Sequence, residues 1–300
     1  MTAIVELDLF SGLPNLVWTL SDPIAGQLLA DIEQLDVRSP GNRPIPDYDE
    51  PLGRPRSGYR GISVEFADHN KHRSFEVFGD LILDVATGRV LRDPGKTLER
   101  RLYESAPASQ RAEALGSMSY AEVTASGREA RIGGIESVPR DLECPQSPQY
   151  RGAQGSFHKF RRTNNCYNYA TKVVNQVPAG AAIPGTPNIG SPLTMAKLKA
   201  ALVDDKLQPL GMALPDQCPA AGTHYIAVLL RKSPGGDVRD FHCLRLDSNG
   251  IWSHKDGKGA VRNVDDNGTK IVDLASAALS WTPELAGFYL FLDVEGGRIN

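Results

Sequence analysis

The sequence predicts an α+β protein in two parts, and two patterns indicate this class. In the first hundred residues, stretches of alternating apolar residues flank residues 23–35, whose apolar residues recur at helical spacing. In the second half, two helical segments precede a series of strand-like segments. Helices and strands that occur in separate runs, rather than in regular alternation, are typical of α+β folds.

The N-terminal elements follow from periodicity and turn residues. Ser21 is a suitable N-cap for the first helix, and Pro23 suits a helix start. Residues 38–57 are rich in Pro, Gly and Arg and predict a loop. In chain order, we expect strands at residues 3–10, 16–20, 59–66 and 74–84, and helices at 23–35 and 98–115.

The second half contains the segments that bear on function. We expect helices at residues 165–177 and 193–204, and strands at 224–231, 240–246, 251–254, 261–263 and 287–294. Residues 116–154, with scattered Gly, Pro and Ser, are irregular. The predicted organisation is an N-terminal α+β domain at 1–104, a linker at 105–154 and a second domain at 155–300.

Composition excludes several classes of protein. The 300 residues carry 33 basic and 36 acidic side chains, a net charge of −3, so we expect neither a nucleic-acid nor a membrane partner. The first eight residues lack the basic and apolar regions of a signal peptide, which predicts a cytoplasmic location. Export by a dedicated, signal-independent secretion system is the alternative.

Four cysteines, Cys144, Cys166, Cys218 and Cys243, leave the redox state open. No C-x-x-C pair occurs, and Cys243 and the neighbouring His242 alternate to opposite faces of a strand. We therefore expect no metal and no cofactor.

Cys166 is the candidate nucleophile because it lies in the first turn of the predicted helix 165–177. A helix N-terminus lowers the pKa of a cysteine, and only the thiolate is strongly nucleophilic. Thr163 and Asn164 are suitable N-caps immediately before it. A core cysteine on an amphipathic helix explains the same pattern equally well.

The stretch from Asp240 to His254 favours the catalytic interpretation. If Gly250 closes a three-residue loop in the left-handed conformation, Leu244 lies opposite His254. His242 and His254 then become diagonal neighbours on one face, about 7 Å apart at their side-chain origins. A two-residue turn would place the two histidines on opposite faces.

This register assigns roles to the histidines. His242 would take the proton of Cys166 and return it to the leaving group, while His254 would orient His242 by accepting a hydrogen bond. Asp240 is the alternative orienter. His224 also begins a strand and is the alternative base; we prefer His242 because it alone has a hairpin partner.

Three further residues complete the predicted site. The backbone N–H of Cys166, with the side chain of Asn164 or Asn165, would stabilise the oxyanion of acyl transfer. Trp252 is either a core residue or a platform for substrate.

The segment from Phe241 to His254 resembles the motif of NlpC-type papain-like cysteine hydrolases. In that family, a strand begins with the catalytic His and runs through a Gly-containing turn into a strand that ends in a second His. The resemblance covers the chain from residue 155 onward. It implies a papain-like core, with Cys166 as nucleophile, His242 as base and His254 as the third polar residue. The segment around Cys166 departs from the family pattern, with Asn165 before it and Tyr167-Asn168 after it.

The expected function is a thiol-dependent hydrolase or acyltransferase that acts on an amide bond of a peptide or amide-containing substrate. Two alternatives stay open. The chain is an effector or toxin that deamidates or cleaves a target protein, or it is a papain-like binding module without activity.

Overall fold

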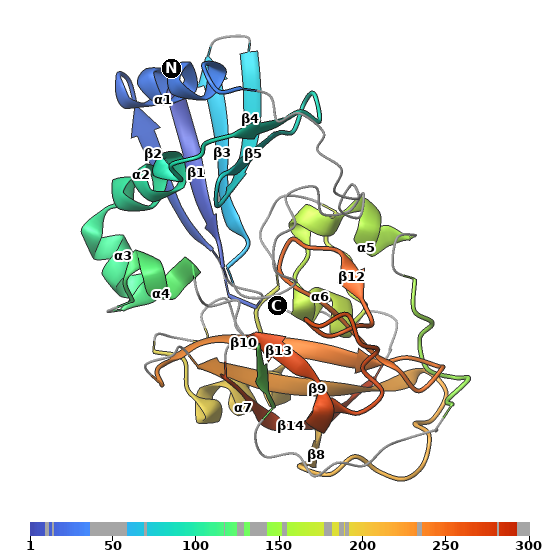
Figure 1. Cartoon of the computed structure of the whole chain (residues 1–300). Coiled ribbons are helices and arrows are strands. Elements are labelled where there is room, and N and C mark those ends of the chain that lie inside the picture. The colour runs from blue at the N-terminus through green and yellow to red at the C-terminus, as the bar shows by residue number, and fades with distance from the viewer. Residues whose placement is uncertain are drawn as a thin grey trace. The chain divides into compact units, whose positions relative to one another are not determined.

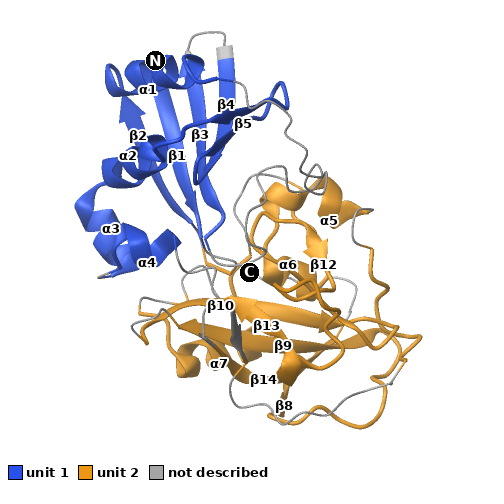
Figure 2. Cartoon of the chain, in the orientation of Figure 1, with its two compact units in different colours: residues 1–9, 15–55, 59–125 blue, residues 10–14, 56–58, 126–300 orange. Residues whose placement is uncertain are grey.

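The chain forms two compact units, which Figure 2 distinguishes by colour. Unit 1 comprises residues 1–9, 15–55 and 59–125, and unit 2 comprises residues 10–14, 56–58 and 126–300. Residues 105–125, predicted as linker, therefore belong to unit 1. The computed structural model describes residues 1–9, 12–13, 15–36, 59–68, 71–116, 118–124, 129–132, 143–151, 155–176, 182–185, 189, 192–232, 236–280 and 282–292. The predicted loop 38–57 lies outside the described residues.

Unit 1 is built on a six-stranded antiparallel sheet with the strand order β2-β1-β3-β4-β5-β6 (Figure 1). Along β1 the side chains of Ala3, Val5 and Leu7 are buried and alternate with more exposed neighbours, as a half-buried strand requires. The strands are β1 (Thr2–Asp8), β2 (Leu16–Ser21), β3 (Gly61–Asp68), β4 (Lys71–Phe78), β5 (Leu81–Asp84) and β6 (Val90–Arg92).

The structure of unit 1 corrects three details of the sequence prediction. The helices of this unit are α1 (Ile24–Glu33), α2 (Thr97–Ser105), α3 (Ala108–Leu115) and α4 (Tyr120–Thr124). The predicted helix 98–115 is two helices, because Pro107 cannot continue α2. The predicted strand 74–84 is divided by a turn at Gly79, whose φ is +61°. Ser21 ends β2, and Pro23 rather than Ser21 is the N-cap of α1.

Unit 2 contains a second six-stranded antiparallel sheet, in the order β12-β11-β10-β9-β14-β8, and a small sheet of β13 and β7. This mixture of helices and antiparallel strands confirms the α+β class. The strands are β7 (Glu129–Arg131), β8 (Gln208–Gly211), β9 (Thr223–Lys232), β10 (Val238–Leu246), β11 (Trp252–Lys255), β12 (Val261–Arg262), β13 (Ala278–Ser280) and β14 (Thr282–Leu292).

Short helices accompany this sheet. They are α5 (Ser156–Lys159), the 3₁₀ helix η1 (Arg161–Thr163), α6 (Cys166–Ala170), α7 (Met195–Asp204) and the 3₁₀ helix η2 (Leu274–Ser276). The helix that carries Cys166 is much shorter than the predicted 165–177. It ends at Ala170 with Thr171 as C-cap, and Lys172 adopts a left-handed φ of +59°, which a helix cannot contain.

Strand β10 presents different residues on its two faces. Phe241 and Cys243 pack with Cys166 and α7 in one apolar cluster, and we call this side the thiol face. Leu244 packs with Trp252 in another cluster. His242 shares the side of Leu244 because strand side chains alternate, and we call this side the imidazole face.

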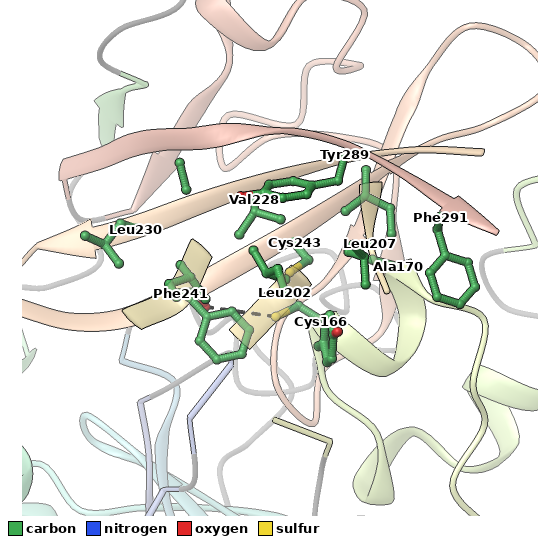
Figure 3. Close-up of a cluster of buried hydrophobic side chains, with 14 of the residues drawn as sticks. Cys166, Ala170, Leu202, Leu207, Val228, Leu230, Phe241, Cys243, Tyr289 and Phe291 are labelled. Carbon is green, nitrogen blue, oxygen red and sulfur yellow. Dashed lines mark hydrogen bonds between the residues drawn. The ribbon is translucent and has the colours of Figure 1, made fainter. Parts of the chain in front are cut away.

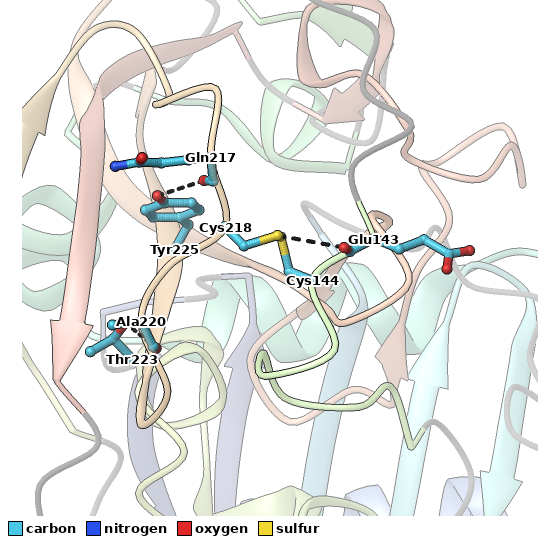
Figure 4. Close-up of a disulfide and its surroundings, with 7 residues drawn as sticks. All are labelled: Glu143, Cys144, Gln217, Cys218, Ala220, Thr223 and Tyr225. Carbon is cyan, nitrogen blue, oxygen red and sulfur yellow. Dashed lines mark hydrogen bonds between the residues drawn. A yellow bond between two sulfur atoms is a disulfide. The ribbon is translucent and has the colours of Figure 1, made fainter.

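A disulfide joins Cys144 to Cys218 in unit 2 (Figure 4). Cys166 and Cys243 are free and buried. The bond settles a pairing that the sequence left open. It links an otherwise irregular segment to the loop before β9, where Tyr225 Oη also donates a hydrogen bond to the Gln217 carbonyl at 2.9 Å. Among the described residues, no helix is both long and apolar enough to cross a bilayer.

Replacing Cys144 with serine should lower the free energy of unfolding of unit 2 by about 2–4 kcal/mol, because the unfolded chain loses a cross-link between distant residues. Urea denaturation without reductant measures the effect. Cys218→Ser and the double variant are the controls and should cost the same as Cys144→Ser, since each removes the same bond. A double variant that loses about twice as much as either single one would contradict the disulfide.

Candidate active site

Cys166 begins α6, and Asn165 caps the helix. The Asn165 side chain accepts hydrogen bonds from the backbone N–H groups of Tyr167 and Asn168, each at 3.0 Å, and the Asn168 side chain accepts one from the backbone of Asn165. This is a reciprocal capping box. The predicted caps Thr163 and Asn164 do not have this role; Thr163 ends η1, and the amide of Asn164 donates to the carbonyls of Phe160 and Asn175.

The thiol of Cys166 is fully enclosed on the thiol face. Its sulfur lies 4.0 Å from the carbonyl oxygen of Phe241, the contact drawn as a dashed line in Figure 3. The neighbouring Cys243 is also fully buried. Burial, and then a hydrogen bond with Cys166, raise the pKa of the Cys243 thiol well above its usual value, so Cys243 is neutral at physiological pH.

The hairpin has the predicted register. Leu244 lies opposite His254, the backbone N–H of Asp247 donates to the carbonyl of Ile251 at 3.1 Å, and Gly250 is left-handed with a φ of +74°. His242 Nε2 and His254 Nδ1 are 3.0 Å apart, with the rings nearly perpendicular. The expected contact between the two histidines is confirmed.

The neighbours of His254 fix the direction of this hydrogen bond. His254 Nε2 lies 3.0 Å from the carbonyl oxygen of Val264, which can only accept. We therefore assign the proton of His254 to Nε2, which leaves Nδ1 as an acceptor for the N–H of His242 Nε2. His254 thus accepts a hydrogen bond from His242 and holds its ring in one orientation.

Asp256 is a member of the site that sequence reasoning missed. Its carboxylate lies 3.6 Å from His242 Nδ1, 3.4 Å from His254 Nδ1 and 3.2 Å from Arg231. Burial raises the pKa of Asp256, but the electrostatic interactions with His242 and Arg231 outweigh burial and hold the pKa well below its usual value. The sequence pattern could have indicated Asp256, because this residue follows His254 by two positions and strand alternation places both side chains on one face.

The alternative base and orienter lie elsewhere. His224 Nε2 is 2.6 Å from the carbonyl oxygen of Ala170, at the end of α6 opposite Cys166, and its ring packs against Phe291. Asp240 is 3.8 Å from Arg231 and accepts two backbone hydrogen bonds from residues 12 and 13. Trp252 is buried against Phe288, which supports its interpretation as a core residue.

The thiol and the imidazole approach β10 from opposite sides. Cys166 contacts the carbonyl of Phe241, which belongs to the peptide bond between Phe241 and His242. The side chain of His242 extends from the imidazole face toward His254. In the described ladder, β10 pairs with β11 only from Leu244 onward, so this peptide bond lies beyond the last pair of that edge.

Lys255 connects the hairpin to the start of α6. This residue was not part of the site predicted from the sequence. Its ammonium group is fully buried and donates to the carbonyl oxygens of Arg161 at 2.7 Å and Asn164 at 2.5 Å, and also to that of Gly257. A second connection joins Tyr169 Oη to Ser253 at 2.6 Å and to Arg245 at 2.8 Å. These bonds fix Cys166 relative to β10 and β11.

His242, His254 and Asp256 also form a group that could hold a metal ion. One ligand atom from each lies within 4.8 Å of the others. Two imidazoles and a carboxylate suit zinc. An ion would have to replace the proton in the hydrogen bond between the two rings.

Comparison with known proteins relates the chain to a shell protein. Over 138 residues it is 34% identical to insoluble matrix shell protein 1 of Ruditapes philippinarum, a match that covers 44% of this chain and 81% of that protein. The chain belongs to the family of this shell protein. No family model matches the chain, and no solved structure matches it.

Asp256→Asn should lower the free energy of unfolding at pH 7 by about 3–5 kcal/mol, because the buried Arg231 and imidazoles lose their counter-charge. The folded-state pKa of Asp256 is depressed, so its stabilisation is complete above the pKa of an unfolded aspartate, about 3.9, and is lost as the pH falls through the lower folded-state pKa.

Urea unfolding between about pH 7 and pH 3 should therefore show a gap between wild type and variant that narrows only below about pH 4. The control is Asp237→Asn, which removes an exposed ion pair with Arg239 and should cost less than about 1 kcal/mol. A gap for Asp256→Asn that stays constant down to pH 3 would contradict the assignment.

Proposed function

We propose that unit 2 is a papain-like thiol hydrolase or acyltransferase that acts on amide bonds. One observation carries the proposal: the His242–His254 hydrogen bond lies in the expected hairpin, on the strand whose Phe241–His242 peptide bond contacts the thiol of Cys166. The proposed nucleophile thus lies on one side of this peptide bond of β10, and the proposed base with its orienting residue lies on the other.

The reaction would proceed through an acyl-enzyme. His242 takes the proton of Cys166, the sulfur attacks the amide carbon, and the C–N bond breaks as His242 returns the proton to the leaving amine. Water or another amine then attacks the thioester and releases Cys166. Asp256 stabilises the imidazolium that His242 becomes, because its carboxylate is ionised and buried beside the ring.

The open edge of β10 is where the thiol and the imidazole can meet. Because β11 pairs with β10 only from Leu244 onward, no second described strand pairs with this edge of β10 at the Phe241–His242 peptide bond, and β10 itself is the strand between the two groups. Activation by a long helix dipole does not support the proposal, since α6 has only five residues.

The proposed location is outside the cytoplasm. The Cys144–Cys218 disulfide supports this, because disulfides persist mainly in oxidising compartments. The relative named as an insoluble matrix protein of a shell agrees with it. This proposal replaces the cytoplasmic location expected from the sequence.

A second candidate is a binding or matrix module without catalysis. The complete burial of Cys166 against Phe241 and Cys243, on the face opposite His242, favours it, as does the name of the shell relative. In this case the buried charged residues serve folding alone.

The pH profile of Cys166 alkylation by iodoacetamide separates the candidates. If His242 takes the thiol proton, the rate for Cys166 should fall less than about tenfold between about pH 9 and pH 7, whereas an ordinary thiol loses more than tenfold over that range. His242→Ala should restore the ordinary dependence. Mass mapping of alkylated peptides assigns the modified cysteine, and Cys243→Ala removes interference.

The matched control is His224→Ala, which removes the other histidine near α6 and should leave the profile unchanged. An identical profile in wild type and His242→Ala would contradict the hydrolase and favour the binding module. The two candidates are distinguished by how the alkylation rate changes with pH, not by the absolute rate. Slow alkylation of an enclosed thiol therefore does not affect the test.

A further inference from the structure

A short segment from the N-terminal part of the sequence belongs to unit 2. Residues 10–14 connect β1 to β2 in the chain but are part of the second compact unit. Within that unit, Gly12 and Leu13 lie beside the thiol face.

The backbone of this segment is held by hydrogen bonds in both directions. The N–H groups of Gly12 and Leu13 donate to one oxygen of the buried Asp240, at 3.1 and 3.0 Å. The carbonyl oxygen of Gly12 accepts a hydrogen bond from the amide of Asn165 at 2.9 Å. Asn165 is the N-cap of the helix that Cys166 begins, so the capping residue also binds the segment.

The position of Gly12 has no room for a side chain. A Cβ atom there would lie 2.6 Å from the carbonyl oxygen of Phe241 and 2.7 Å from its ring. The same carbonyl oxygen contacts the sulfur of Cys166. The next side chain, Leu13, packs against the apolar cluster that contains Cys166, Phe241 and Cys243.

We propose that Gly12–Leu13 occupies the substrate-binding site of Cys166 as a pseudosubstrate, and that the substrates are peptides with glycine followed by a large apolar residue. The proposal rests on the proposed hydrolase function and names its substrate class. Backbone hydrogen bonds align the peptide, the contact with Phe241 admits only glycine, and the apolar cluster accepts the following side chain. In this state the segment encloses the thiol.

The same contacts give Asp240 and Asn165 a role in peptide binding rather than in proton transfer from the thiol of Cys166. Asp240 binds two adjacent peptide N–H groups, and Asn165 binds the carbonyl between them. Such donors and acceptors recognise any peptide backbone, so the steric limit at Gly12 supplies the selectivity. Asp240 and Asn165 are thus assigned to substrate binding.

Full-length Gly12→Ala should expose the thiol. Its Cβ cannot be accommodated, so the segment leaves the site, and iodoacetamide should alkylate Cys166 about tenfold faster than in wild type at the same pH. The matched control is Gly185→Ala, which places a Cβ 3.0 Å from Ala201 of α7 and should leave the rate for Cys166 unchanged. Leu13→Ala is a milder second variant and should raise the rate about threefold.

A peptide in trans tests the substrate class. Acetyl-Phe-Ser-Gly-Leu-Pro-amide, the sequence of residues 10–14, should protect Cys166 of Gly12→Ala from alkylation, and the peptide with alanine in place of glycine should not. Cooperative thermal unfolding of each variant confirms that it is folded. Unchanged alkylation in both folded variants, or equal protection by the two peptides, would overturn the proposal.

The outcome is independent of catalysis. Alkylation rate and peptide protection report binding alone, whereas the pH profile and its dependence on His242 report the hydrolase function. Exposure of Cys166 and selective protection, together with a profile unaffected by His242→Ala, would keep the peptide site and refute the hydrolase.

Discussion

The burial of an ionised carboxylate beside Arg231 and two imidazoles is the constraint on which unit 2 depends. Asp256 is buried, and a buried charge is tolerated only with counter-charges and hydrogen bonds close by. Arg231 lies beside both carboxylates, Asp240 and Asp256, and the imidazoles of His242 and His254 lie beside Asp256. The ends of β9, β10 and β11 must therefore converge, and this convergence sets the geometry of the candidate site.

The thiol face is determined by different forces. Cys166, Phe241 and Cys243 pack with α7 in an apolar cluster, and Lys255 joins the start of α6 to the hairpin through backbone carbonyls. A single strand thus separates an apolar compartment with the thiol from a charged compartment with the histidines. Chemistry between them requires the edge of β10 near Phe241, the same place that Gly12 occupies.

Local patterns predicted most of the strands correctly, and the helices less well. The β10–β11 register followed from one glycine, because a three-residue loop with a left-handed Gly250 allows only one pairing. Helix lengths were less reliable. The apolar spacing of residues 165–177 predicted a long helix, but the helix ends after five residues. The backbone that follows bonds to side chains instead: the N–H of Asn175 donates to the side chain of Asn164, and the side chain of Asn168 donates to the carbonyl of Val173. The capping Asn165 was named as a site residue but not as the cap.

The sequence by itself determined the α+β class, the strand alternation of β10 and the pairing of His242 with His254, because these depend on residues close together in the chain. The tertiary structure decided which side of β10 Cys166 faces, the contribution of Asp256 and Arg231, the Cys144–Cys218 bond and the position of Gly12. Apart from Asp256, whose place on the face of His254 follows from strand alternation, these features join residues separated by up to 228 positions, such as Gly12 and Asp240, and no local periodicity encodes them. They arise only when apolar burial and charge pairing are satisfied together across the whole unit.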